Sequence, residues 1–191
     1  MTRGRMLVIS GPSGSGKSTL VKRLLEDPRV VFSISCTTRA PRDGEVDGRD
    51  YQFLSRDEFR ARVERNAFIE WAEVYGNLYG TPREPIERAL AAGKVYLLEI
   101  DVQGALKLKS LGVDALYIFI SPPDLETLRA RLVGRGTDKP ESIERRMSKA
   151  RDEMTEASRY DHIVINRDID LALAEVRRLV GLPGGPEVSR A

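Results

Sequence analysis

The chain has 191 residues, a length typical of one domain, and its 31 basic and 29 acidic side chains leave a net charge of +2. That surplus is too small to indicate a nucleic-acid partner, and no apolar run is long enough to cross a membrane. The single cysteine, Cys36, excludes an internal disulfide and a zinc site built from cysteines. We therefore expect a cytoplasmic protein that binds neither nucleic acid nor membrane, and the sequence leaves its oligomeric state open.

The first predicted strand, residues 6–10, is a continuous apolar run that leads directly into a glycine-rich segment. That segment, residues 11–18, has the Gly-x-x-x-x-Gly-Lys-Ser pattern of a phosphate-binding P-loop. Its glycines let backbone N–H groups converge on an anion, and a helix expected over residues 17–25 adds its positive N-terminal end. Lys17 places a charge near the β- and γ-phosphates, and the Ser18 hydroxyl is a suitable Mg²⁺ ligand. The pattern predicts a nucleoside triphosphate site.

Residues 35–80 differ in composition from the segments around them and predict a small β-rich insertion. Ser55 and Glu58 form a capping-box pattern that predicts the start of a helix within it. Near the end of the insertion, the sequence predicts interruptions of regular secondary structure at Gly76-Asn77 and at Gly80. Strands are expected at 30–34, just before the insertion, and at 51–54 and 68–74 inside it.

Helices and buried strands alternate through the rest of the chain. Thr81-Pro82-Arg83-Glu84 predicts a second capping box, with Pro82 at the first helical position. Apolar runs predict strands at 95–100, 115–120 and 162–165, and helical periodicity predicts helices at 81–92, 102–111, 125–133, from 138 onward and at 169–180. This order is typical of an α/β fold of the P-loop NTPase type, with a five-stranded parallel sheet flanked by helices. Ligands are then expected beyond the carboxyl ends of the strands.

The insertion carries a group of residues suited to a second phosphate. Arg39 and Arg42 lie beside hydroxyl residues, and Tyr51 and Tyr79 add two phenols. Guanidinium groups grip a phosphate through two parallel hydrogen bonds, so this group predicts an acceptor that carries a phosphate. Exposed arginines are common in loops, and a solvated turn is the alternative explanation.

Glu70 lies between large apolar residues in Phe68-Ile69-Glu70-Trp71. A carboxylate in a pocket can accept two parallel N–H bonds, and guanine offers such a pair whereas adenine does not. Glu99 and Thr81 are candidates to complete a guanine-binding pocket. A strand that points Glu70 to solvent is the alternative, and Thr81 also fits a structural role as a helix N-cap.

Residues 125–160 contain seven arginines interleaved with acidic residues. Most of them fit a solvated helical hairpin with ion pairs one turn apart. Arg135 lies between two glycines, and Arg146 lies on the predicted long helix. These two are the preferred candidates to bring positive charge to a migrating phosphoryl group, followed by Arg131.

Taken together, these motifs resemble guanylate kinase. The resemblance runs from about residue 5 to about residue 182 and rests on segments 11–18, 35–42 with Tyr51, 68–71, 76–81, 98–104 and 134–137. It implies the ATP-binding residues Gly11, Pro12, Ser13, Gly14, Ser15, Gly16, Lys17, Ser18, Thr19 and Asn166. It implies the GMP-binding residues Ser35, Arg39, Arg42, Tyr51, Glu70, Tyr79, Thr81, Glu99 and Asp101. The catalytic residues would be Lys17, Arg39, Arg135 and Arg146, and Ser18 would bind Mg²⁺, with Asp101 acting through water. Family members often have an acidic residue where this chain has Arg167.

The resemblance also implies a division of the chain and a reaction. Residues 1–34, 81–124 and 156–182 would form the core, 35–80 a GMP-binding insertion, 125–155 a helical lid and 183–191 a disordered tail. The expected reaction is Mg²⁺-dependent transfer of the ATP γ-phosphoryl group to GMP, which gives ADP and GDP. Two other classes are a protein-binding module without catalysis, against which the intact Lys17 and Ser18 argue, and a kinase of sugar phosphates, against which Glu70 and Thr81 argue.

Overall fold

The structure is a computed structural model that describes residues 4–74, 76–134 and 140–182. The strands are β1 (Arg5–Ser10), β2 (Val30–Phe32), β3 (Cys36–Thr37), β4 (Gln52–Phe53), β5 (Phe68–Val74), β6 (Asn77–Pro82), β7 (Val95–Glu99), β8 (Leu116–Ser121) and β9 (His162–Ile165). The helices are α1 (Lys17–Leu24), α2 (Arg56–Glu64), α3 (Arg83–Ala91), α4 (Val102–Ser110), α5 (Leu125–Val133), α6 (Pro140–Thr155) and α7 (Ile169–Val180), with a 3₁₀ turn at Glu156–Arg159. The tail for which disorder was predicted, 183–191, lies outside the described residues.

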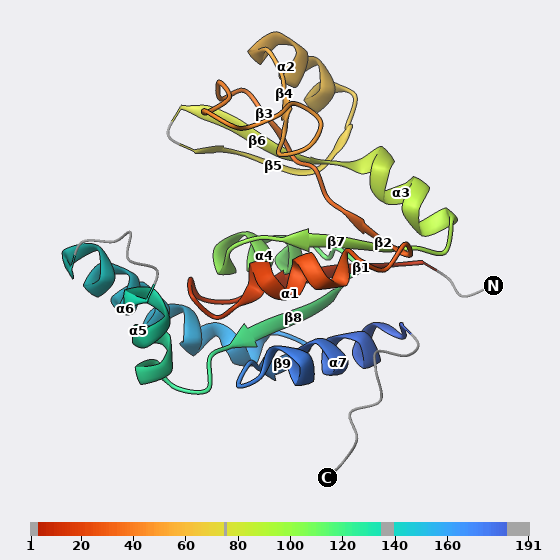
Figure 1. Ribbon diagram of the computed structural model, residues 1–191. Helices are drawn as coiled ribbons and strands as arrows, with labels where there is room; N and C mark the ends of the chain where they lie inside the picture. Colours follow the sequence, from red (N-terminus) through yellow and green to blue (C-terminus); the bar gives the residue numbers. More distant parts are fainter. Residues whose placement is uncertain (1–3, 75, 135–139, 183–191) are drawn as a thin grey trace.

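Five strands form the central sheet in the order β2-β7-β1-β8-β9, and every neighbouring pair is parallel. The predicted P-loop-type α/β fold is therefore confirmed (Figure 1). Residues 6–10 of β1 are all buried, because helices cover both faces of the sheet at its centre. The chain passes from β7 to β8 across β1, so the P-loop at the end of β1 lies where the direction of winding reverses. Ligand sites of open α/β sheets lie at such switch points.

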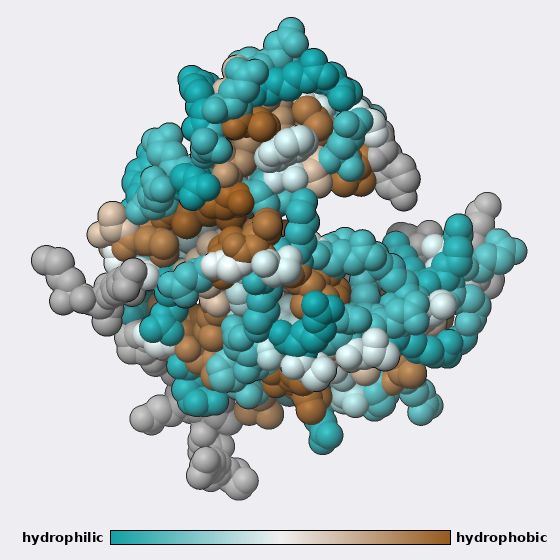
Figure 2. All heavy atoms as spheres, turned by 180° about the vertical axis from the view of Figure 1, so that it is seen from behind, coloured by the Kyte–Doolittle hydropathy of each residue, from teal (hydrophilic) through white to brown (hydrophobic). Residues whose placement is uncertain are grey.

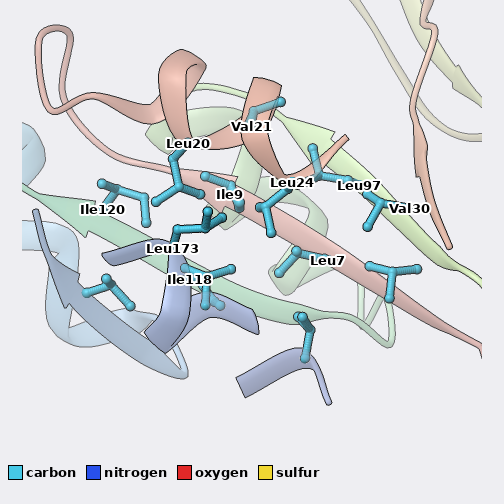
Figure 3. Packing of buried hydrophobic residues seen from close by; sticks show 14 of the residues in the cluster. Leu7, Ile9, Leu20, Val21, Leu24, Val30, Leu97, Ile118, Ile120 and Leu173 are labelled. Atoms are coloured by element: carbon cyan, nitrogen blue, oxygen red, sulfur yellow. The ribbon is translucent and has the colours of Figure 1, made fainter. Parts of the chain in front are cut away.

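Two apolar layers hold the helices to this sheet. On one face, α1 and α7 pack against β1 and β8, and Figure 3 shows Leu20 and Leu24 of α1 with Leu173 of α7 around Leu7 and Ile9. On the other face, α3 and α4 pack against β1, β7 and β8. Alternate residues of β1 enter the two layers, as the pleat of a strand requires, and so the P-loop starts from a fixed point.

A second sheet, in the order β4-β3-β6-β5, is built from residues 36–82. Its helix α2 begins with the predicted capping box, in which the Ser55 side chain accepts from Glu58 N and Glu58 accepts from Ser55 N. The predicted break at Gly80 was wrong, because β6 runs through it. A Cβ at Gly80 would lie 2.9 Å from the Phe68 ring and 3.0 Å from the Phe59 ring, so glycine here lets two stacked rings approach the strand.

The predicted capping box at Thr81 was also wrong. Thr81 belongs to β6, Pro82 is the N-cap residue of α3, and no side chain caps that helix. Pairing of β6 with β5 holds Thr81 in the sheet and directs its hydroxyl to Glu70. Tertiary pairing thus overrides a local helix-start pattern.

The second sheet stands above the carboxyl ends of the central strands in the view of Figure 1. Figure 2 shows the space-filling surface hollowed between this upper part and the rest of the molecule. Among the described residues, no helix has the length and apolar character that spanning a membrane requires.

Candidate functional site

The P-loop adopts backbone conformations that its glycines make possible. Gly14 and Gly16 have φ values of 89° and 93°. At Gly16 a Cβ would lie 2.2 Å from Asn166 Nδ2, so the loop also needs glycine for close approach. Asn166 follows β9, is 4% exposed, and donates from Nδ2 to the carbonyl of Ser15 at 2.7 Å. The predicted adenine-side residue is therefore in contact with the loop backbone.

Arg131 of α5 completes this support. Its Nη2 donates to the Asn166 carbonyl at 2.9 Å, and its Nη1 lies 3.4 Å from the Ser15 carbonyl, which it also contacts as a donor. Helix α5, strand β9 and the P-loop are thereby joined through polar contacts. The arginine that sequence reasoning placed third among the phosphate ligands acts here on protein carbonyls.

Where the P-loop meets α1, a lysine and a hydroxyl of that helix lie near two carboxylates from the end of β7 and the start of α4. Lys17 Nζ donates to the carbonyls of Gly11 and Pro12, the second at 3.0 Å. Ser18 Oγ donates to Glu99 Oε1 at 2.7 Å. Asp101 is the N-cap residue of α4, and its Oδ1 accepts from Gly104 N at 2.8 Å. Lys17, Ser18, Glu99 and Asp101 all line one cavity of about 400 Å³.

Helix α6 closes the opposite side of this cavity. Arg146, Lys149 and Glu153 line it, and their spacing places all three on one face of the helix. Burial raises the pKa of the Glu153 carboxyl, and Lys149 offsets part of that rise. Arg135, the other predicted arginine of this region, lies outside the described residues.

Arg39, just after β3, is held by a carboxylate that the sequence did not single out. Its Nη2 donates to both oxygens of Glu45, at 2.8 and 2.9 Å, and its Nη1 donates to the Ala40 carbonyl at 2.7 Å. Glu45 raises the pKa of Arg39, and Arg39 holds the pKa of Glu45 below its usual range. The guanidinium also lies 5.5 Å from the centre of the Tyr51 ring. Glu45 therefore fixes the direction of Arg39.

The other predicted phosphate residues surround this pair. Tyr51 and Tyr79 meet edge to face with ring centres 6.2 Å apart, so both phenols lie near Arg39. The Arg42 backbone N–H donates to Glu45 Oε2 at 2.8 Å, while the Arg42 side chain is exposed. Ser35 lies just before β3, and its carbonyl accepts from Gln52 N. The structure thus brings Arg39, Arg42, Tyr51 and Tyr79 into one neighbourhood.

Glu70 and Thr81 face each other across β5 and β6. The strand register pairs them, and Thr81 Oγ1 donates to Glu70 Oε1 at 2.9 Å. Lys107 of α4 lies on the other side of the carboxylate, with Nζ 3.8 Å from Glu70 Oε2. The same ammonium donates to the Trp71 carbonyl at 3.0 Å and so links the central domain to the second sheet.

The predicted guanine residues fall into two groups. Glu70 and Thr81 lie together, whereas the Glu99 side chain contacts Ser18 of the P-loop. Glu45 and Lys107 were missed, because their importance depends on contacts between segments far apart in sequence. Lys149 and Glu153 were also missed, although their spacing of three and seven residues from Arg146 on a predicted helix offered a signal.

Comparison with known proteins agrees with this geometry. A family model described as guanylate kinase matches residues 3–181. The chain belongs to the guanylate kinase family. The guanylate kinase of Gloeobacter violaceus is 50% identical over 177 residues, which cover 92% of this chain and 86% of that protein. The guanylate kinase of Cereibacter sphaeroides is 49% identical over 181 residues, with coverage of 93% and 86%.

A solved structure of the family shows the same fold. The crystal structure of guanylate kinase from Anaplasma phagocytophilum superposes with a TM-score of 0.69 at 36% identity, and the match covers 95% of this chain and 86% of that one. The resemblance to guanylate kinase seen in the sequence is thereby confirmed. This guanylate kinase family member is a phosphotransferase of the nucleoside monophosphate kinase class.

Proposed function

We propose that the chain transfers the γ-phosphoryl group of ATP to a phosphate oxygen of GMP, giving ADP and GDP, with Mg²⁺ as cofactor. The observation that carries the choice of acceptor is the pairing of Glu70 with Thr81 across two strands of the second sheet, with Lys107 beside the carboxylate. A carboxylate whose oxygens face a pocket accepts the N1–H and the exocyclic amine of guanine together. Adenine has no such pair of donors, and its binding would leave the carboxylate without those hydrogen bonds.

The acceptor phosphate would be bound by Arg39, Arg42, Tyr51, Tyr79 and Ser35. Glu45 holds Arg39 through one terminal nitrogen, Nη2, and the Ala40 carbonyl holds the other, Nη1, so the guanidinium is fixed in place. A fixed guanidinium loses less conformational entropy when it binds a phosphate. Residues 35–80 would thus act as the GMP-binding insertion.

The donor would bind at the P-loop, with the residues of 11–19 around its phosphates and Asn166 near its base. Lys17, now on the Gly11 and Pro12 carbonyls, has a flexible stem that lets its ammonium turn to the phosphates. Arg146 of α6 faces the same cavity, and residues 125–155 would act as the lid.

The residues at the loop fit a Mg²⁺ ion. The Ser18 hydroxyl and the Glu99 and Asp101 carboxylates line one cavity, and oxygen ligands of this kind suit a hard cation. We propose that Ser18 binds the ion directly and that Asp101 acts through water. The bond from Ser18 to Glu99 adds Glu99 to this group, beside its predicted role toward guanine. When bound, the ion would neutralise charge on the ATP phosphates.

The reaction needs no general base, because a GMP phosphate oxygen is already anionic near neutral pH. The bond from the γ-phosphorus to the β,γ-bridging oxygen breaks, and a bond to the GMP phosphate oxygen forms. Lys17, Arg39 and Arg146 would align the two nucleotides and neutralise the developing charge. Exclusion of water from the hollow between the two sheets would prevent hydrolysis of ATP. Both substrates are cytoplasmic nucleotides, which supports a cytoplasmic location.

A coupled assay of ADP release tests this proposal. ATP is supplied with GMP, dGMP, AMP or a sugar phosphate, and we expect turnover with GMP at least about 100-fold faster than with AMP. Equal turnover with AMP contradicts the role of Glu70. Turnover with a sugar phosphate alone contradicts the proposed acceptor.

A further inference from the structure

The donor cavity contains a charged pair that the proposed reaction does not use. Lys149 and Glu153 lie one turn apart on α6, and both line the cavity with Lys17, Ser18 and Asp101. Lys149 Nζ is 3.5 Å from Glu153 Oε1. The Lys149 side chain is 61% exposed, whereas that of Glu153 is 12% exposed. The carboxylate therefore belongs to the cavity wall, and the ammonium lies at its mouth.

Helix stability gives little reason for this pair. A lysine that precedes a glutamate by four residues is in the less favourable order for a pair along a helix. The ammonium of this pair is exposed, and solvent weakens its attraction to the carboxylate. Glu153 is also poorly placed as a carboxylate, because burial raises its pKa. A role in the cavity therefore explains this pair better than a contribution to helix stability.

Among the described residues that line the cavity, positive and negative side chains are equal in number. Three cationic side chains, those of Lys17, Arg146 and Lys149, meet three carboxylates, those of Glu99, Asp101 and Glu153. The proposed function assigns Glu99 and Asp101 to the Mg²⁺ side. Glu153 is the remaining carboxylate among the described lining residues, and it faces a site that receives the negative charge of a triphosphate.

We propose that Lys149 is an additional phosphate-binding residue of the donor site, and that Glu153 holds its ammonium until the nucleotide arrives. The phosphates then replace Glu153 as the partner of Lys149. The four-carbon stem of lysine allows this exchange without movement of the helix. The Glu153 carboxylate competes with the phosphates for Lys149 and repels them through the cavity.

The inference rests on the proposed function only in so far as the P-loop binds ATP. It predicts that Lys149→Gln weakens binding of a non-hydrolysable ATP analogue with Mg²⁺ by about 3- to 10-fold, because one charge-assisted contact is lost. Lys149→Arg should restore most of the affinity. Glu153→Gln should tighten binding by a few-fold, and this gain should shrink when Lys149→Gln is also present.

Isothermal titration calorimetry of the analogue measures these constants for each variant, at low and at raised salt. Arg88→Gln is the matched control, because Arg88 and Glu84 form an exposed pair one turn apart on α3, outside the lining of this cavity. Its affinity should equal that of the wild type. Lys149→Gln should also lessen the salt dependence of binding.

Two results would overturn the inference. One is a Lys149→Gln affinity within twofold of both the wild type and the Arg88→Gln control. The other is a Glu153→Gln variant that binds the analogue no better than the wild type. Calorimetry with the analogue does not require GMP. Failure of GMP as an acceptor in the coupled assay would therefore refute the proposed function without deciding whether Lys149 binds the ATP phosphates.

Discussion

Two arginine–carboxylate clusters in this protein differ in how the carboxylate engages the arginine. In the first, Asp27 accepts from Arg29 Nε and Nη2, at 2.9 and 2.8 Å, and from Arg177 Nη2 at 2.8 Å. In the second, Glu45 turns both its oxygens to a single nitrogen, Nη2 of Arg39. Asp27 thus binds two nitrogens of Arg29, whereas Glu45 binds only one nitrogen of Arg39.

The surroundings of the two clusters match this difference. The Asp27 side chain is 5% exposed and joins the end of α1 to α7, far along the chain. Arg39 lies beside Tyr51 and Tyr79 in the proposed GMP pocket. The comparison indicates that the Asp27 cluster, in which one carboxylate binds two arginines, stabilises the fold, whereas the Glu45 cluster orients an arginine of the proposed site.

The largest expected effect is the loss of turnover in Lys17→Met. This change removes the ammonium at the P-loop, so kcat should fall by about 1,000-fold or more, because the charge that develops on the phosphoryl group loses its partner. The melting temperature should stay within a few degrees of the wild type. Steady-state kinetics and thermal denaturation check both values, and an active Lys17→Met enzyme contradicts the P-loop assignment.

Asp27→Asn should produce the opposite pattern. The variant removes the buried negative charge that accepts from Arg29 and Arg177, so the free energy of unfolding should fall by about 3 kcal/mol. The kcat of the folded enzyme should be unchanged. Urea denaturation with the coupled assay tests both points, and a variant with normal stability but impaired turnover would reverse the distinction between the clusters.

The same cluster predicts a pH dependence of stability. Hydrogen bonds from Arg29 hold the pKa of Asp27 well below its usual range. A lowered pKa in the folded state stabilises the protein above the unfolded carboxyl pKa, about 3.9, and this contribution begins to fall near that pH and is lost progressively toward the folded-state pKa. Denaturation series between pH 3 and 7 should therefore show a steeper loss at low pH in the wild type than in Asp27→Asn.

Glu70→Gln tests the guanine pocket. One carboxylate oxygen becomes an amide donor that opposes the donors of guanine, so kcat/KM for GMP should fall by about 100-fold. The KM for ATP should stay within about twofold. Equal losses for both nucleotides would remove Glu70 from the acceptor site. Lys107→Gln is a useful companion, because it alters the neighbouring charge and retains a donor.

The smallest effect is expected from Glu45→Gln. Arg39 loses its fixed direction but keeps its charge, so KM for GMP should rise by about threefold to fivefold. Its melting temperature should change little, in contrast to Asp27→Asn. If Glu45→Gln melts far below the wild type, the two clusters do not differ in kind.

The central sheet was predictable because local patterns determine it. The continuous apolar run of residues 6–10 and the P-loop that follows specify β1, the turn and α1 without reference to distant residues. The second sheet was less predictable. Gly80 and Thr81 carry break and helix-start signals, yet pairing with β5 and the packing of the Phe59 and Phe68 rings keep both in a strand.

The candidate site divides in the same way. Lys17, Ser18 and Arg39 were recognisable because their motifs are local. The contact between Ser18 and Glu99, and the position of Lys107 beside Glu70, depend on side-chain directions set by the assembled sheets. No spacing rule in the sequence reports such contacts, and for that reason Glu45 and Lys107 emerged only from the structure.

The most direct test of the central claim is a competition between acceptors. ATP labelled with ³²P in the γ-phosphate is incubated with the enzyme and an equimolar mixture of GMP and AMP, and the labelled diphosphates are separated. We predict that nearly all transferred label appears in GDP. Label divided equally between GDP and ADP, or found only in inorganic phosphate, would contradict the account.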